Sequence, residues 1–199
     1  MTIISSDLIN RYPQTAICIR KLNNIQITKP HVFNVFRNHS GLDVGYASMV
    51  LSHRFVFDKK KPIPTIRLEY PDAPIIGWGQ YPGVGHDILL AKKFVEYFEK
   101  VFEDNYGSQF IQDAFNKNRF GLPYGQLATK RTPYHSNMEL FLESILLHEL
   151  VHWGRLVSGL SSGPREALSN DPKKASKERG WMFVREAYGS YITPGQLGI

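Results

Sequence analysis

An eight-residue run, LLHELVHW, constrains this chain more than any other part of its sequence. It contains the pattern H-E-x-x-H, formed by His148, Glu149 and His152. Residues four apart lie on one face of an α-helix. The two histidines can therefore direct imidazole nitrogens at one metal ion, and Glu149 lies where it can act on a water bound to that metal. The spacing predicts half of a zinc site on a helix.

The residues around the motif indicate that this helix is buried. They are uncharged, and a helix that is apolar nearly all round belongs in a protein interior. Buried histidines and a buried glutamate are costly unless they are paired or bound to a metal. The alternative is that the histidines are hydrogen-bonded core residues and the glutamate faces water. The neighbours in question are Ile145, Leu146, Leu150, Val151 and Trp153.

Length and composition predict one globular domain over residues 1–199. The chain is 42% hydrophobic and 13% aromatic, which suits a packed core. Cys18 is its only cysteine, so an intramolecular disulfide and a cysteine metal cluster are both excluded.

The formal net charge is +6, but the basic residues are scattered in short groups such as Lys59–Lys61. Without a basic stripe or a reading motif, we expect no nucleic-acid partner. No apolar run reaches membrane-spanning length, and the N-terminus shows no signal peptide. We therefore expect no membrane span.

The hydrophobic pattern predicts an α+β fold with a strand-rich part at 1–85 and a helical part at 86–199. β-branched and aromatic residues between turn signals favour strands in the first part. The expected strands are Ala16–Leu22, His31–Phe36, Tyr46–Leu51, Arg54–Phe57 and Thr65–Tyr70.

After residue 86 the apolar period becomes helical. Asp87 is expected to cap a helix that reaches Phe102, and a shorter helix is expected at Ser108–Asn116. Ser136 and Glu139 fit a capping box at the start of the motif helix, with Gly154 as its stop. The last helix is expected to open at Asp171–Pro172 and to end before Gly189.

A catalytic zinc usually has three protein ligands and an open fourth position. The extended metzincin motif needs Gly at 155 and His at 158, where this chain has Arg155 and Ser158. No histidine follows His152, so the third ligand is expected to be a carboxylate. The candidates are Glu166, Asp171, Glu178 and Glu186.

Glu186 is the predicted third ligand, because it stands in the apolar stretch WMFVREAYG, where an unpaired carboxylate would be costly. A buried ion pair with an arginine is the alternative for it. Glu178 and Asp171 stay possible, although the first has a polar context and the second resembles a helix cap. Two residues after Glu186, Tyr188 is a candidate catalytic donor to an oxyanion, as is His135; packing at a helix end explains Tyr188 equally well.

The run LLHELVHWGR with the later EAYG resembles the toxin-associated metallopeptidase domains of bacterial polymorphic toxins and type VI secretion effectors. This resemblance implies a zincin-like fold with His148 and His152 as ligands of one Zn²⁺ and Glu149 as catalytic base. It also implies Glu186 as the third, gluzincin-like ligand. The chain departs from the aspzincin pattern by lacking the glycine–threonine element.

The expected function is that of a zinc-dependent endopeptidase, a bacterial toxin or effector domain that acts on a protein or peptide. Zinc would activate a water, and Glu149 would take its proton and pass it to the leaving amine. The substrate would lie along a strand edge, with Thr65–Tyr70 as one candidate. The alternatives are a zincin-fold hydrolase of a non-peptide substrate and a non-catalytic metal-binding domain. The resemblance further implies a possible immunity protein and delivery into a target cell by a specialised secretion system; otherwise the protein would be cytoplasmic.

Overall fold

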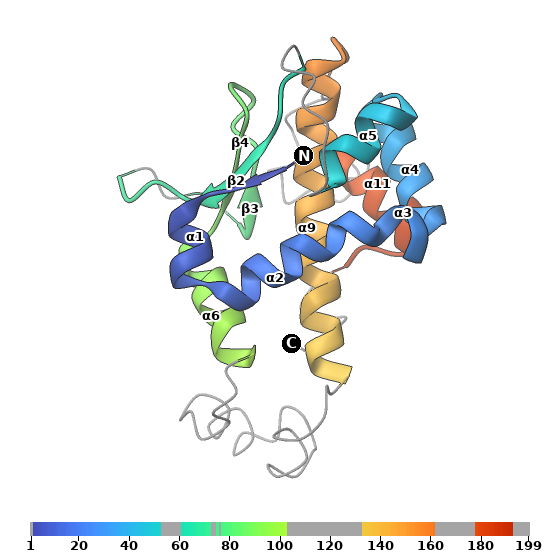
Figure 1. The fold of residues 1–199 in the computed structure, drawn as a ribbon. Coiled ribbons are helices and arrows are strands. Elements are labelled where there is room, and N and C mark those ends of the chain that lie inside the picture. The colour runs from blue at the N-terminus through green and yellow to red at the C-terminus, as the bar shows by residue number, and fades with distance from the viewer. Residues whose placement is uncertain are drawn as a thin grey trace.

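The computed structural model describes residues 2–52, 61–72, 75, 77–102, 133–161 and 178–192. Figure 1 shows a small sheet beside a set of helices arranged around one long helix, α9. The strands are β1 (Ile3–Ile4), β2 (Thr65–Leu68), β3 (Gly79–Gln80) and β4 (Asp87–Leu90). The helices are α1 (Ser6–Arg11), α2 (Pro13–Lys21), the 3-10 turn η1 (Leu22–Asn24), α3 (Ile25–Thr28), α4 (Pro30–Ser40), α5 (Val44–Leu51), α6 (Lys92–Phe102), α9 (Pro133–Val157) and α11 (Arg179–Tyr188).

The sheet has the strand order β1-β2-β4-β3. β2 pairs in parallel with β1 and with β4, whereas β3 runs antiparallel to β4. β2 therefore lies inside the sheet, and the expectation that Thr65–Tyr70 offers a substrate edge is wrong. Of the described strands next to α9, β3 is the one at the sheet edge.

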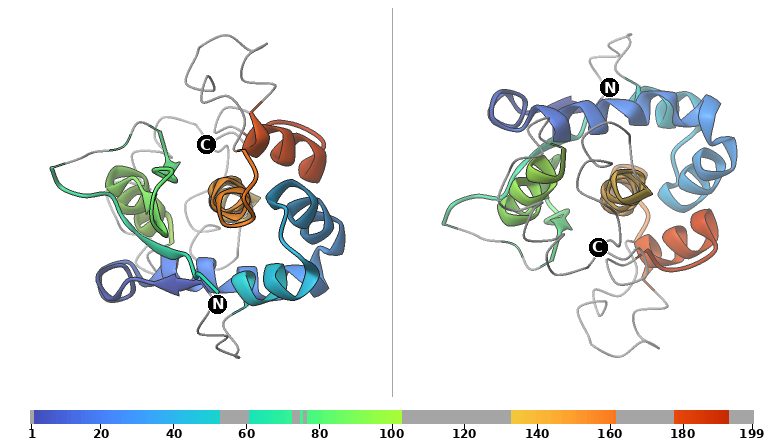
Figure 2. Two further views of the ribbon diagram at one scale, coloured as in Figure 1. Left: turned by 90° about the horizontal axis from the view of Figure 1, so that it is seen from above. Right: turned by 90° about the horizontal axis from the view of Figure 1, so that it is seen from below.

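Helix α9 is the central element of the fold. Figure 2 shows it end-on, with the sheet and α6 on one side and α4 and α11 on the other. Its apolar side chains belong to a core that joins all these elements, and Trp153 is fully buried there. The expectation of a buried motif helix is confirmed. Both faces of the H-E-x-x-H segment therefore lie against other parts of the protein.

Three of the expected strands are helices, so the expectation of a strand-rich part at 1–85 is wrong for these segments. Ala16–Leu22 lies in α2 and η1, His31–Phe36 in α4, and Tyr46–Leu51 in α5. Pro13 and Pro30 open α2 and α4 at first-turn positions that suit proline. Tertiary contacts also favour the helices: Glu99 of α6 accepts the first backbone N–H groups of α2, and buried residues recur with helical spacing. These effects outweigh the β propensity of the branched and aromatic residues.

The strand expected at Thr65–Tyr70 is present as β2. Asp87 begins strand β4 instead of capping a helix, because the apolar run after it is buried in the sheet interior. The helix then begins at Lys92.

Helix α9 is longer at both ends than expected. It begins at Pro133, which leaves the expected capping box inside the helix, where Glu139 pairs with Lys21. It continues past Gly154 to Val157. Gly154 lies inside the helix, where its lack of a side chain allows α4 to approach closely. The strand expected at Arg54–Phe57 and the helix expected at Ser108–Asn116 lie outside the described residues.

Among the described helices, none combines the length and the apolar composition that crossing a membrane requires.

Gly154 tests the packing of α9 against α4. A Cβ at this position would lie 2.7 Å from Cβ of Ser40 and 3.2 Å from its carbonyl oxygen. We expect Gly154→Ala to lower the free energy of unfolding by about 1–2 kcal/mol, because overpacking outweighs the better helix propensity of alanine. Gly45→Ala in α5 is the control, since its Cβ would meet only Asp43 Oδ1 at 3.4 Å. Denaturant melts that show both variants equally stabilised would contradict this packing.

Candidate metal centre

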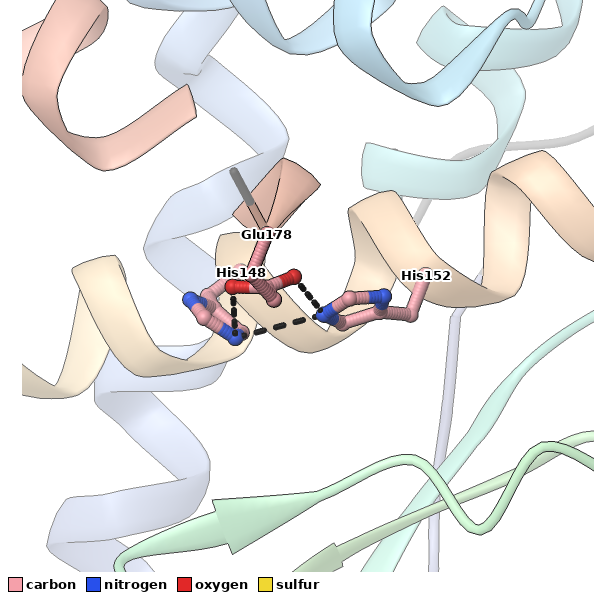
Figure 3. A group of neighbouring side chains, drawn as sticks. All are labelled: His148, His152 and Glu178. Atoms are coloured by element: carbon pink, nitrogen blue, oxygen red, sulfur yellow. Dashed lines mark hydrogen bonds and ion pairs between the residues drawn. The ribbon is translucent and has the colours of Figure 1, made fainter. Parts of the chain in front are cut away.

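The two motif histidines point toward one another from adjacent turns of α9. Their Nε2 atoms lie 3.3 Å apart, and both side chains are mostly buried (Figure 3). Two zinc ligands at about 2.0–2.1 Å in a tetrahedron stand about 3.4 Å apart. The separation of these nitrogens therefore suits two ligands of a single ion.

Glu178 completes the group from α11. Its carboxylate oxygens lie 2.5 Å from Nε2 of His152 and 3.5 Å from Nε2 of His148. In Figure 3 this carboxylate faces both imidazoles from the other side of the gap between the helices. Within the described part of the chain, these three residues are the group whose ligand atoms could hold one metal ion.

The local structure of α11 explains why Glu178 points at the histidines. Glu178 is the N-cap residue of α11, and its carboxylate accepts the backbone N–H groups of Gly180 at 2.6 Å and Trp181 at 2.8 Å. These bonds hold the side chain at the start of the helix, close to α9. The residue is only 3% exposed, so its carboxylate is fixed by four partners in a site with little water.

The electrostatics of the three side chains keep a negative charge beside the imidazoles. Burial would raise the pKa of Glu178, but the hydrogen bond to His152, the charges of both histidines and the N–H of Gly180 lower it to about 2. Burial lowers the pKa of His148, which favours the neutral ring that binds metals. For His152, burial acts to lower the pKa, but the carboxylate of Glu178 raises it overall. The same negative charge would attract a divalent ion.

Two imidazole nitrogens and a carboxylate oxygen are the donor set of a catalytic zinc site that keeps one position open. The residues present thus fit one Zn²⁺ in chemistry and in spacing.

Glu149 lies beside this group on the sheet-facing side of α9. Its Oε2 accepts the backbone N–H of Tyr81 at 2.7 Å, directly after β3, and its Oε1 is 3.9 Å from Nε2 of His148. Gly79 makes this approach of β3 possible, because a Cβ there would lie 2.6 Å from Cγ2 of Ile145 and 3.5 Å from Cγ of Glu149. The carboxylate is therefore oriented next to the candidate metal centre without belonging to it.

Residues 124–189 match the model of a protein family described as Metallopeptidase toxin 3. The match spans about one third of the chain and includes the motif histidines, Glu149 and Glu178. It confirms the resemblance drawn from LLHELVHWGR and EAYG, and it supports a metal-dependent peptidase of the toxin type. No curated protein and no solved structure matches the chain.

The structure places Glu186, the predicted third ligand, away from the metal centre. Its side chain is 55% exposed, and its Oε2 lies 2.8 Å from Nε2 of His39 in α4. The backbone carbonyl of the same residue faces Nε2 of His31 at 3.2 Å. Glu186 therefore anchors the C-terminal part of α11 to α4. The carboxylate that lies beside the two histidines is that of Glu178, which the sequence had placed on a solvated face.

Tyr188 and His135, the two candidate oxyanion donors, both have structural partners. The hydroxyl of Tyr188 donates to Oε1 of Glu143 at 2.8 Å, and burial together with that carboxylate raises its pKa well above the ordinary value. His135 is buried, with Nε2 at 3.0 Å from the carbonyl oxygen of Val101. These contacts support packing roles for both. The other candidate ligands, Glu166 and Asp171, lie outside the described residues.

From the sequence alone, Glu178 ranks below Glu186 because the last helix is expected to start at Asp171. A helix beginning there puts Glu178 in the interior of the helix, among lysines. One feature of the sequence could have indicated Glu178: the order Glu-x-Gly-Trp at residues 178–181. A glycine two residues after the carboxylate allows another side chain to approach the start of the helix. Gly180 packs against His148 so closely that an added Cβ would lie 2.5 Å from Nε2 of its ring.

Exchange of the two glutamates tests the ligand assignment. We expect Glu178→Gln to lose its zinc, because an amide is a weak zinc ligand, and Glu186→Gln to keep about one zinc per chain. Metal analysis of the purified variants measures this, with circular dichroism to show that each is folded. Zinc lost from Glu186→Gln and kept by Glu178→Gln would restore the original assignment.

Gly180 offers a test that leaves every ligand in place. We expect Gly180→Ala to weaken zinc affinity by about 10–100-fold, because the added methyl group must displace the ring of His148. Competition with a chelator gives the affinity. An unchanged affinity would show that His148 is not held in this position when it binds the metal.

Proposed function

We propose that this chain is a zinc-dependent endopeptidase with His148, His152 and Glu178 as metal ligands and Glu149 as the general base. The observation that carries the proposal is the convergence of three ligand atoms, from mostly buried side chains, next to a separately oriented carboxylate. Two histidines alone would suit many sites. Two histidines, a carboxylate ligand and a second, non-ligand carboxylate suit metal-assisted hydrolysis.

A zinc ion bound there would supply positive charge that polarises the substrate carbonyl and makes a water more acidic. The protein residues supply the proton transfers. Glu149 accepts the proton of the attacking water and later delivers it to the nitrogen of the leaving amine. The N–H of Tyr81 holds one oxygen of Glu149, so the other stays directed toward His148 and the reacting atoms.

The edge of β3 is the proposed place for the substrate backbone. The carbonyl of Trp78 accepts from Ala91, so the neighbouring residue, Gly79, turns its backbone groups away from β4. The sheet face at Gly79 packs on α9 at the level of Glu149, since an added Cβ there would lie 3.5 Å from Cγ of Glu149, so this edge passes close to the base. An extended peptide that pairs with this edge brings a main-chain carbonyl to the catalytic groups without requiring a particular sequence.

The family match also supports a proposal for the substrate, the delivery and the partner of the protein. A metallopeptidase toxin acts on proteins of another cell, so we propose a protein substrate, delivery by a secretion system and an immunity protein that protects the producer. The immunity protein would have to block the edge of β3 or cover the residues of the candidate metal centre.

Replacement of the general base tests the mechanism. We expect Glu149→Gln to keep its zinc and to lose about 10²–10⁴-fold in kcat on casein, because the glutamine cannot take up a proton. His148→Ala should lose both zinc and activity. Glu96→Gln, which changes an exposed carboxylate on α6, serves as the control with wild-type rates. A Glu149→Gln variant that cuts casein as fast as the wild type would contradict the proposed role.

A further inference from the structure

Two half-buried aromatic residues stand beside the metal centre and have no part in the proposed mechanism. The ring of Trp181 meets the ring of His148 edge to face, with centroids 4.9 Å apart at 74°. The ring of Tyr191 meets Trp181 in the same manner, with centroids 5.7 Å apart at 78°. The three rings thus form a continuous row that begins at a metal ligand.

The backbone of α11 creates this row. Gly180 has no side chain, so His148 can lie against the start of the helix and contact the next residue, Trp181. At the other end of the helix, Gly189 takes a left-handed conformation with φ of 78°, which reverses the chain and places Tyr191 on Trp181. Both glycines are therefore required for the position of the aromatic pair.

The pair keeps exposed surface, unlike Phe183 of α11. Phe183, two residues after Trp181, is fully buried against Phe36. Trp181 and Tyr191 are only half-buried in the described part of the chain. Large aromatic surface left open next to a reaction centre is suited to contact with a ligand.

The two sides of α9 offer different contacts to a substrate. On the sheet side, Gly79 contributes no side chain. Its backbone groups hold a main chain and do not distinguish side chains. On the α11 side, the first surface beyond His148 is the indole of Trp181. Side chains of an extended peptide alternate in direction, so a residue next to the bond that is cut can project over this surface.

Given the proposed peptidase function, we propose that Trp181 and Tyr191 determine its specificity. They receive a large apolar side chain, such as that of Phe or Leu, from the substrate residue adjacent to the bond that is cut. Tyr191 supports Trp181 and extends the apolar surface that the substrate side chain covers. An apolar subsite of this kind discriminates between side chains by about 10–200-fold.

Cleavage of a proteome-derived peptide library, read by mass spectrometry, gives the preference of the zinc-loaded wild-type protein. A peptide series with Phe, Leu, Ala or Gly next to the cut bond then gives kcat/KM for each side chain. We expect the wild type to prefer Phe or Leu over Gly at least tenfold. Trp181→Ala should remove most of this preference while the rate on the Gly peptide changes less than about twofold.

Tyr191→Ala should reduce the same preference with zinc content unchanged, since Tyr191 contacts Trp181 and not the metal ligands in the described contacts. Tyr70→Ala is the control, because it removes a surface tyrosine that lies two residues after the end of β2 and bonds to Asp87. It should leave both the rates and the preference unchanged.

An equal loss on all four peptides in Trp181→Ala would show that Trp181 only supports His148, and it would overturn the inference. If Trp181→Ala loses its zinc, Tyr191→Ala decides: a reduced preference supports the subsite, and an unchanged preference overturns it. A wild type that cuts peptides without favouring Phe or Leu refutes the subsite alone. A zinc-loaded wild type that cuts no peptide refutes the proposed function, and the subsite with it.

Discussion

The buried carboxylate of Glu178 is the interaction on which the candidate site depends. An ionised carboxylate with 3% exposure has lost most of its hydration, and its burial is tolerable only with partners that replace the water. Two backbone N–H groups at the start of α11 and the two imidazoles of α9 are those partners. Removing one partner of such a group typically costs about 3–5 kcal/mol. The start of α11 is therefore held where a metal centre needs it.

Close approach of backbone on two sides of α9 is the second requirement. Gly79 lets β3 reach Glu149, and Gly180 lets α11 reach His148. A side chain at either position would separate the elements that carry the base, the ligands and the proposed substrate edge. The chemistry thus rests on two contacts in which a residue without a side chain faces a functional one.

The parts of the site that are local in sequence could be predicted, and those that depend on tertiary contacts could not. His148, Glu149 and His152 follow from helical spacing alone, and their burial follows from the apolar residues beside them. Glu178 could not be chosen in this way, because its role depends on where α11 begins. Composition favours strands for the segments in α2, α4 and α5, whereas the helices α2 and α4 are set by their first-turn prolines, and α2 also by its partner Glu99.

The direction of α11 explains why Glu178, and not Glu186, lies beside the two histidines. Glu178 at its start meets His148 and His152, whereas Tyr188 at its end meets Glu143, which lies earlier on α9. The helix therefore runs antiparallel to α9, as expected of a returning helix, but its register is shifted by two turns from the one assumed. That shift brings Glu178 to the histidines and leaves Glu186 to bind His39 of α4. Both carboxylates contribute to this arrangement. Glu186 holds the C-terminal end of α11 against α4, and this contact limits how far Glu178 at the other end can move from the histidines.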